Sequence, residues 1–151
     1  MTAKRRPVLS VVVPVFDEHE TIDEFHCRLG NALGRIETVS PQSCEVIYVD
    51  DGSSDGSGEA LRLLASDDAR VRVITFSRNF GHQVAISAGL DHAHGRAAVV
   101  IDSDLQDPPE LIPDLVAQWR EGAQVVHAVR TGREGESRFK VLTARWFYRG
   151  I

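Results

Sequence analysis

Several features are scarce or missing in this chain of 151 residues. It has two cysteines, Cys27 and Cys44, whose spacing fits neither a metal-binding motif nor a disulfide framework, so we expect reduced thiols and a cytosolic setting. No 18 apolar residues run together, which predicts no membrane span in this sequence. A net charge of −5 argues against a general nucleic-acid binder.

Other absences narrow the fold and the function. We find no internal repeat, linker or low-complexity tract, and 42% hydrophobic content over this length predicts one compact domain. The apolar run Leu9–Phe16 follows basic residues but is broken by Pro14, so it is too short for a signal peptide. No G-x-G-x-x-G motif follows this run, which disfavours a nicotinamide-dependent dehydrogenase.

What the sequence does contain is an alternation of apolar β-branched runs and helical segments. The runs lack polar alternation, which is typical of strands covered on both faces. The expected strands are Val8–Val15, Glu45–Asp50, Val71–Ser77, Ala97–Asp102 and Gln124–Val129. The expected helices are Thr21–Ile36, Ser57–Ala65, His82–His94 and Glu110–Glu121. This order predicts an α/β fold with three layers and a mostly parallel sheet, in which ligands bind beyond the carboxyl ends of the strands.

Two aspartates follow the fourth expected strand. Alternate side chains of an extended chain share a face, so Asp102, Asp104 and Gln106 are expected to project from one side. Neighbouring carboxylates repel each other unless a cation lies between them, and oxygen ligands suit Mg²⁺ or Mn²⁺. Such an ion would in turn attract a diphosphate. The alternative is a solvated acidic turn that leads into a helix.

The first two expected strands also end in acidic residues. Glu18 follows the first strand, and its alternative role is a plain helix entry, where negative charge is favoured. Asp50 and Asp51 end the second strand, where they are placed to accept hydrogen bonds from a ribose hydroxyl or a base N–H. Asp55 is better explained as a cap for the helix that follows.

Three further positions have competing interpretations. Arg78, at the tip of the third strand, is placed to offer a fork of donors to a phosphate. We interpret His82, at the start of the next helix, as a solvated or capping residue rather than a ligand. Asp107 precedes Pro108 and Glu110 in a capping-box pattern, so we expect Asp107 to cap a helix and hold the preceding segment still.

The segment after the last expected strand is rich in arginine. On a helical projection, Arg138, Arg145 and Arg149 form one narrow stripe. The adjoining band contains Phe139, Leu142 and Trp146. This pattern predicts a basic amphipathic helix that lies at a membrane surface or docks on a partner, and a helix packed on its own domain is the alternative. Because no helix-ending signal follows Gly150, we expect the chain to be cut rather than finished at Ile151.

Four motifs in a fixed order carry a resemblance to a known family. They are Val-Val-Pro-Val-Phe-Asp-Glu at 12–18, Val-Asp-Asp-Gly-Ser-Ser-Asp-Gly at 49–56, Ser-Arg-Asn-Phe-Gly-His-Gln at 77–83 and Ile-Asp-Ser-Asp-Leu-Gln-Asp-Pro-Pro-Glu at 101–110. With these motifs the chain resembles the GT-A glycosyltransferases of family 2, and most of all their polyprenyl-phosphate branch, which is similar to dolichol-phosphate mannose synthase. The resemblance covers nearly the whole chain, and four ordered motifs are more specific than any one alone.

The resemblance implies a role for each matching residue. The nucleotide-binding set that it implies is Pro14, Val15, Phe16, Glu18, Asp50, Asp51 and Ser103. The metal and diphosphate set is Asp102, Asp104 and Gln106, with Mg²⁺ or Mn²⁺ as the cofactor. Arg130 and Arg133 match basic residues that meet the phosphate groups of donor or acceptor. The catalytic residues expected from this match are Asp102, Asp104 and Arg130.

The activity that the resemblance implies is an inverting transfer of a sugar from a nucleoside diphosphate sugar to a polyprenyl phosphate lipid. A phosphate monoester is already anionic at neutral pH, so the acceptor needs no general base, and the sequence shows no obvious one. The expected domains are a GT-A nucleotide-sugar-binding catalytic domain over residues 1–135 and the start of an interfacial helix over 136–151.

The resemblance also sets the expected surroundings of the protein. Members of this branch are longer, so we expect this chain to bind its donor and a membrane surface but to transfer sugar slowly or not at all. The full-length protein is expected at the cytoplasmic face of the membrane, and the chain as given is expected to be soluble or peripheral. No nucleic-acid partner is expected, and self-association stays open.

Two rival classes also stay open. A family 2 transferase that acts on a saccharide or another hydroxyl acceptor would need a carboxylate base and would not need the basic helix. A non-catalytic nucleotide-sugar-binding or assembly module is the other rival, and the intact pair Asp102 and Asp104 argues against it. The sequence identifies neither the sugar, nor the nucleotide, nor the length of the lipid.

Overall fold

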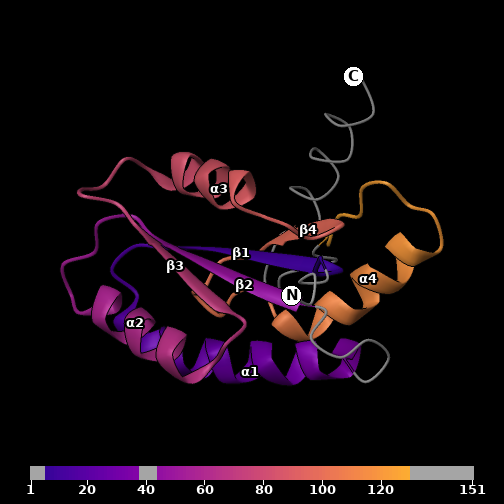
Figure 1. The fold of residues 1–151 in the computed structure, drawn as a ribbon, viewed down its shortest axis with the longest axis horizontal. Coiled ribbons are helices and arrows are strands. Elements are labelled where there is room, and N and C mark those ends of the chain that lie inside the picture. Colours follow the sequence, from indigo (N-terminus) through magenta and orange to yellow (C-terminus); the bar gives the residue numbers. More distant parts are fainter. Residues whose placement is uncertain (1–5, 38–43, 130–151) are drawn as a thin grey trace, which may run out of the picture.

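The computed structural model describes residues 6–37 and 44–129. Figure 1 shows their strands and helices in an alternating order along the chain. These elements are β1 (Leu9–Val15), α1 (His19–Glu37), β2 (Cys44–Asp50), α2 (Ser57–Asp67), β3 (Val71–Thr75), α3 (His82–Asp91), β4 (Ala97–Val100), the 3₁₀ helix η1 (Pro109–Leu111) and α4 (Ile112–Arg120).

The strands form one parallel sheet with the order β3-β2-β1-β4. In this register Val15 lies beside Asp50, and Asp50 lies beside Thr75. Because every pair is parallel, the carboxyl ends of these strands meet at one edge of the sheet, where the connecting loops gather. The structure thereby confirms the predicted α/β class, with a sheet that is parallel throughout the described residues.

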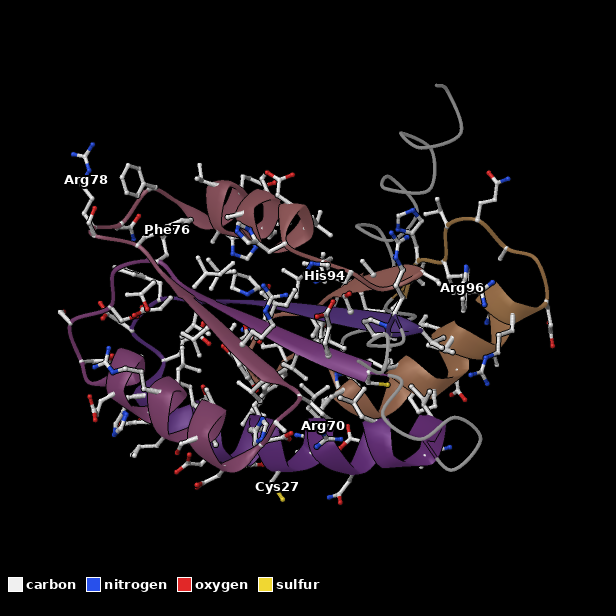
Figure 2. All side chains as sticks on the ribbon, viewed as in Figure 1. Cys27, Arg70, Phe76, Arg78, His94 and Arg96 are labelled. Carbon is white, nitrogen blue, oxygen red and sulfur yellow. The ribbon has the colours of Figure 1, made fainter. Side chains whose placement is uncertain are left out.

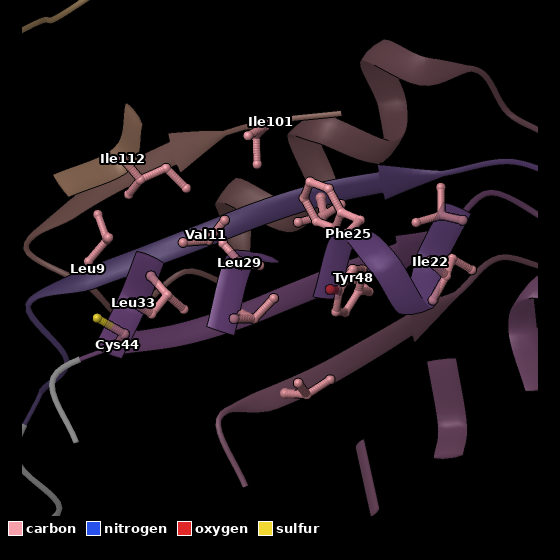
Figure 3. Packing of buried hydrophobic residues seen from close by; sticks show 14 of the residues in the cluster. Leu9, Val11, Ile22, Phe25, Leu29, Leu33, Cys44, Tyr48, Ile101 and Ile112 are labelled. Atoms are coloured by element: carbon pink, nitrogen blue, oxygen red, sulfur yellow. The ribbon is translucent and has the colours of Figure 1, made fainter. Parts of the chain in front are cut away.

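Helices cover both faces of the sheet, which gives the three predicted layers (Figure 1). On one face, side chains of β1 and β2 pack with α1 in the larger core, where Val11, Phe25, Leu29 and Tyr48 are fully buried (Figure 3). α2 and α4 add further buried side chains to this same core. On the other face, α3 packs against β1 and β2. A covering on both faces explains why β1 is buried along its whole length and is apolar except for Ser10.

α3 approaches the sheet closely at Gly89. A Cβ atom at this position would lie 2.3 Å from Cγ1 of Val12 and 3.2 Å from Cγ2 of Val49. Only a residue without a side chain permits this approach of helix to sheet. The close packing places the first turn of α3 beside the carboxyl ends of β1 and β2.

Some details of the predicted elements are wrong. No strand forms at 124–129, where Val125 and Val129 are 72% and 77% exposed. An apolar run becomes a strand only if a neighbouring strand pairs with it, and a run alone does not encode its partner. β3 and β4 end at Thr75 and Val100, each two residues before the predicted end, and α3 ends at Asp91, three residues early.

A further difference is the start of the last helix. Pro108, not Asp107, is the residue before η1, and no side-chain hydrogen bond caps it. Glu110 instead accepts two hydrogen bonds from the guanidinium of Arg28, at 2.8 and 2.9 Å. The acid of the predicted capping box therefore ties η1 to α1. Among the described residues, no helix is both long and apolar enough to cross a membrane.

Candidate functional site

A pocket of about 320 Å³ opens at the carboxyl edge of the sheet. Each strand in the described part of the chain sends residues to it from its end, its following loop or the next helix. The residues that line it are Pro14, Val15, Phe16, Glu18, Asp51, Asn79, His82, Ala85, Asp102 and Asp104. The structure therefore brings together, at the predicted edge, most of the residues that the motifs singled out.

The loops after β1 and β2 hold each other through Asp17. Its backbone has a φ of 52°, a left-handed conformation that aspartate tolerates better than most residues. Its Oδ1 accepts a hydrogen bond from the N–H of Ser54 at 2.7 Å, and its own N–H donates to Oγ of Ser53 at 3.1 Å. These bonds hold together the two loops that contribute Phe16, Glu18 and Asp51 to the pocket lining.

Asp55 binds the first residues of two helices. Its Oδ1 accepts hydrogen bonds from the N–H and the hydroxyl of Ser57 in α2, and its Oδ2 accepts one from the N–H of His19 in α1. Burial opposes ionisation of this carboxyl, but these hydrogen bonds outweigh it and lower the pKa of Asp55 to about 2. Gly56, not Asp55, is the N-cap residue of α2, so the predicted cap is wrong in position. Asp55 lies one residue earlier and binds the first residue of both α2 and α1.

Asp51 fixes the loop that follows β3. It is 2% exposed, and its two carboxylate oxygens accept hydrogen bonds from the N–H groups of Phe80 at 2.7 Å and Gly81 at 2.9 Å. The adjacent Gly52 has a φ of 74°, and a Cβ atom on it would lie 2.4 Å from the carbonyl carbon of Arg78. The loops after β2 and β3 are thus in direct backbone contact.

Asp50 faces the turn after β2 rather than the pocket. It is 3% exposed, and its Oδ1 accepts a hydrogen bond from the N–H of Ser53 at 2.9 Å. Its Oδ2 lies 2.7 Å from the position that a Cβ atom on Gly58 would take. Asp50 is not among the residues that line the pocket, so its contact with a base or ribose stays a prediction.

Glu18 and Ser103 join the loops after β1 and β4. The hydroxyl of Ser103, which is fully buried, donates a hydrogen bond to Oε2 of Glu18. Burial raises the pKa of the Glu18 carboxyl, and the charges of Asp104 and Asp102 raise it further, although Ser103 and His82 act in the opposite direction. Glu18 therefore carries its negative charge at an energetic cost.

The segment after β4 turns instead of continuing in an extended form. Leu105 has a φ of 63°, and the N–H of Gln106 donates to Oδ1 of Asp104 at 2.9 Å. Asp102 and Asp104 consequently line the pocket, while Gln106 is exposed and is not a lining residue. The predicted one-sided arrangement is wrong for Gln106, because the backbone turns at Leu105. Its role as a metal ligand stays a prediction.

The donor chemistry of the pocket fits a hard divalent ion. Burial raises the pKa of the Asp102 carboxyl, as do the charges of Asp104 and Asp107, while His82 lowers it. Within the described residues, no three side chains of histidine, cysteine, aspartate or glutamate are arranged to hold a metal by themselves. Magnesium commonly takes one or two carboxylates and completes its shell with water and substrate phosphates. Asp102 and Asp104 fit that pattern of shared ligation.

The structure also brings to the pocket residues that the sequence did not single out as ligands. Nε2 of His82 lies 3.5 Å from Oδ1 of Asp102, and Asn79 lines the wall near Asp51. Asn79 belongs to the loop after β3 and His82 begins α3, and their position after a strand end was the available signal. Arg78 instead extends from the tip of this loop (Figure 2), with its guanidinium 4.8 Å from the ring centre of Phe80.

Some predicted site residues lie outside the described part of the chain. Arg130 and Arg133, expected to meet phosphate groups, belong to the segment 130–151. The stripe formed by Arg138, Arg145 and Arg149 lies in the same segment. These assignments stay predictions.

Comparison with known sequences gives a family match over most of the chain. The family described as "Glycosyl transferase family 2" matches residues 10–150. A protein of Bacillus subtilis (strain 168) named "Uncharacterized glycosyltransferase YkcC" is 51% identical over 140 residues, which are 93% of this chain and 42% of that protein. The "Bactoprenol glucosyl transferase" of Shigella phage SfV is 42% identical over 141 residues, 93% of this chain and 45% of that protein.

A third relative is also named for a lipid phosphate. The "Undecaprenyl-phosphate 4-deoxy-4-formamido-L-arabinose transferase" of Salmonella choleraesuis (strain SC-B67) is 42% identical over 128 residues, 83% of this chain and 38% of that protein. This chain thus spans less than half the length of these curated relatives.

Solved structures agree on the fold. The mannosyltransferase PcManGT from Pyrobaculum calidifontis, in complex with GDP-Man and Mn²⁺, aligns with a TM-score of 0.62 and 24% identity over 77% of this chain and 33% of that one. S. aureus TarS 1–349 aligns with a TM-score of 0.59 and 24% identity over 75% of this chain and 32% of that one. These likenesses show a GT-A fold.

Proposed function

Since the chain belongs to glycosyl transferase family 2, we propose that it is the donor-binding part of an enzyme that transfers a sugar from a nucleoside diphosphate sugar to a polyprenyl phosphate. The proposal further states that the reaction depends on a divalent metal ion and inverts the anomeric carbon. Relatives named for bactoprenol and undecaprenyl phosphate support the acceptor class. The described pocket supports the donor class.

The observation that carries the proposal is the position of two carboxylates in the pocket at the carboxyl edge of a parallel sheet. Asp102 and Asp104 line a pocket whose other wall is made of the end of β1, and that wall includes Phe16, a 45% exposed aromatic ring. Exposed aromatic surface beside backbone groups suits a base, and paired carboxylates suit a metal–diphosphate. One cavity thus offers groups suited to the base and groups suited to the metal–diphosphate of a nucleotide.

The proposed assignments follow from this division. Pro14, Val15, Phe16 and Glu18 would surround the base and ribose, with Asp51 holding the loop that closes this end. Asp102 and Asp104 would hold Mg²⁺ or Mn²⁺, which when bound supplies Lewis acidity at the leaving diphosphate. The hydrogen bond from Ser103 to Glu18 would keep the two halves in register.

The chemistry at the acceptor follows from its charge. An acceptor oxygen of the polyprenyl phosphate would form a bond to the anomeric carbon while the bond from that carbon to the diphosphate oxygen breaks. The phosphate monoester is largely ionised at neutral pH, because its second pKa is about 6. No protein group then has to remove a proton, in contrast to transfer onto a saccharide hydroxyl.

The remaining proposals concern the segment beyond the described residues. We propose that residues 1–135 belong to the catalytic domain, that Arg130 and Arg133 meet phosphate groups, and that 136–151 begin an interfacial helix. The arginine stripe beside aromatic residues supports this view, since such helices bind anionic membrane surfaces. A lipid acceptor and a basic helix of this kind together suggest the cytoplasmic face of the membrane.

Calorimetry followed by a transfer assay tests the proposal. The chain is titrated with UDP, GDP, ADP and CDP, with Mn²⁺ and then with excess chelator, and we expect one of them to bind only with the metal. Sugar transfer from the matching donor is then compared between undecaprenyl phosphate in liposomes and a free saccharide acceptor. Binding of none of the four nucleotides would refute the donor assignment. Transfer to the saccharide alone would refute the acceptor class.

A further inference from the structure

The charge of the pocket poses a problem for a diphosphate ligand. Four carboxylates line it, those of Glu18, Asp51, Asp102 and Asp104, and among its described lining residues there is no lysine or arginine. A nucleoside diphosphate brings further negative charge into this space. A divalent ion on two of the carboxylates offsets part of the repulsion, but phosphate oxygens also need hydrogen-bond donors once they leave water.

The described side chains that line the pocket offer two donors. One is Asn79. The neighbouring residue Phe80 donates its N–H to Asp51, so Asn79 lies toward the end of the pocket that we assign to the base. The other is His82, whose Nε2 lies 3.5 Å from Oδ1 of Asp102. His82 is therefore the lining donor beside the carboxylate assigned to the metal and diphosphate.

From these positions we infer that His82 donates a hydrogen bond from Nε2 to the diphosphate of the nucleotide donor. The inference rests on the proposed function and adds a phosphate-contacting residue to it. A neutral imidazole suffices, because one of its ring nitrogens carries a proton in either tautomer and Asp102 next to Nε2 favours the proton there. The side chain of His82 is 52% exposed, so it is accessible to a ligand in the pocket rather than buried.

The backbone around His82 is held firmly enough for this task. The preceding Gly81 donates its N–H to Asp51 at 2.9 Å, and α3 is locked to the sheet at Gly89. These contacts position the first residue of α3 without using its side chain. The imidazole is thus presented to the pocket by groups that a substitution at position 82 leaves in place.

Substitutions that move the donor by one bond give a matched test. His82→Gln places an amide nitrogen near the position of Nε2, His82→Asn places it one bond closer to the backbone, and His82→Ala removes it. His127→Ala, an exposed histidine outside the pocket lining, is the control. The probe is whichever of UDP, GDP, ADP and CDP binds the wild type with Mn²⁺, together with the corresponding nucleoside without phosphates.

We expect His82→Ala to weaken binding of the nucleoside diphosphate by roughly tenfold to a hundredfold, the usual effect of losing a hydrogen bond to a charged group. Binding of the nucleoside should not change, His82→Gln should recover most of the loss, and His82→Asn should recover little. His127→Ala should match the wild type. At saturating nucleotide, the Mn²⁺ concentration that gives half-maximal binding should change much less than the nucleotide affinity, because the inferred contact of His82 is with the phosphate.

Three results would overturn the inference alone. These are an unchanged affinity of His82→Ala for the diphosphate, an equal loss for nucleoside and diphosphate, and a change confined to the Mn²⁺ requirement. If the wild type binds none of the four nucleotides, the proposed function fails and the inference fails with it. The wild-type titration therefore separates the two failures.

Discussion

The Ser103 hydroxyl donates a hydrogen bond to the Glu18 carboxylate and so ties the loop after β4 to the loop after β1. The two strands are neighbours in the sheet, but Glu18 and Ser103 are 85 residues apart in the sequence. Because Ser103 is fully buried, water does not reach its hydroxyl to replace this bond on the Ser103 side. This one contact fixes the Asp102–Asp104 segment relative to the end of β1.

Replacing Ser103 with alanine should therefore destabilise the fold. We expect Ser103→Ala to lower the free energy of unfolding by about 1.5–3 kcal/mol, the usual range for a hydrogen bond to a charged group. The pKa of Glu18 should rise further, because Ser103 lowers it in the wild type. Urea denaturation measures the first effect. The exposed Ser66→Ala on α2 is the control, and equal stability of the two variants would contradict the role given to Ser103.

Asp51 should hold the loop after β3 only as a carboxylate, in which both oxygens accept hydrogen bonds. In Asp51→Asn, an amide NH₂ replaces one of the two oxygens that accept hydrogen bonds from the N–H groups of Phe80 and Gly81. The new NH₂ group then faces one of these N–H groups, and neither can accept a hydrogen bond. We expect a loss of about 1–3 kcal/mol in stability and faster hydrogen exchange at the amides of both residues. Exchange followed by NMR checks this. Unchanged protection at these amides, as expected for the exposed control Asp91→Asn, would show that the loop is held by other contacts.

Asp104 should matter for ligand binding and not for folding. Its charge opposes that of Glu18, so we expect Asp104→Asn to melt at the same temperature as the wild type or higher. A nucleoside diphosphate with Mn²⁺ should raise the melting temperature of the wild type, because a ligand stabilises the state that it binds, but not that of the variant. Thermal denaturation with and without chelator measures both. Equal stabilisation of the wild type in excess chelator would exclude a metal-dependent site.

Because of the hydrogen bonds to Asp55, the stability of the fold should depend on pH. Its folded-state pKa of about 2 lies below the ordinary 3.8, so its contribution to stability is complete above about pH 4 and disappears as the pH falls toward 2. We expect Asp55→Asn to be less stable than the wild type at neutral pH by about 0.5–2 kcal/mol, as for a lost helix cap. The difference should shrink between pH 4 and pH 2 in denaturant titrations. A difference that stays constant with pH would exclude the carboxylate charge as its source.

Two helix glycines should respond oppositely to the same change. Gly34→Ala in α1 meets no atom within 4 Å and should stabilise the protein by about 0.5–1 kcal/mol, because alanine favours helices. Gly89→Ala in α3 would place its Cβ against Val12, so it should destabilise by about 1–3 kcal/mol in spite of its propensity. Chemical denaturation compares the pair. Stabilisation by both variants would mean that α3 can move away from the sheet at little cost.

The order of strands and helices was predictable from sequence, because the strands are mostly apolar, β-branched runs that are followed by polar residues. β1 and β2 are the clearest cases, and their ends correctly predicted where the pocket lies. The run Gln124–Val129 has the same pattern but forms no strand, because pairing depends on a neighbour that the pattern does not specify.

The roles of individual carboxylates were harder to predict. Asp50 and Asp51 are adjacent in sequence, yet one binds its own turn and the other binds the loop after β3. Gln106 turns away because Leu105 adopts a left-handed conformation, which is rare for leucine and has no signal in the pattern. His82 reaches the pocket only through the close packing of α3 on the sheet. Such features depend on contacts between distant segments, and a local pattern does not encode them.

The central position of β1 has a consequence for the order in which the molecule folds. β1 pairs with β2 on one side and with β4, about ninety residues later in the chain, on the other. Loop closure over the shorter distance costs less entropy, so we expect β1, β2 and β3 to assemble first during synthesis from the amino terminus. The end of β1, which we propose to bind the base, would then be formed before β4 docks and brings Asp102 into place. A ribosome-bound nascent chain that ends before β4 would accordingly already contain half of a binding site.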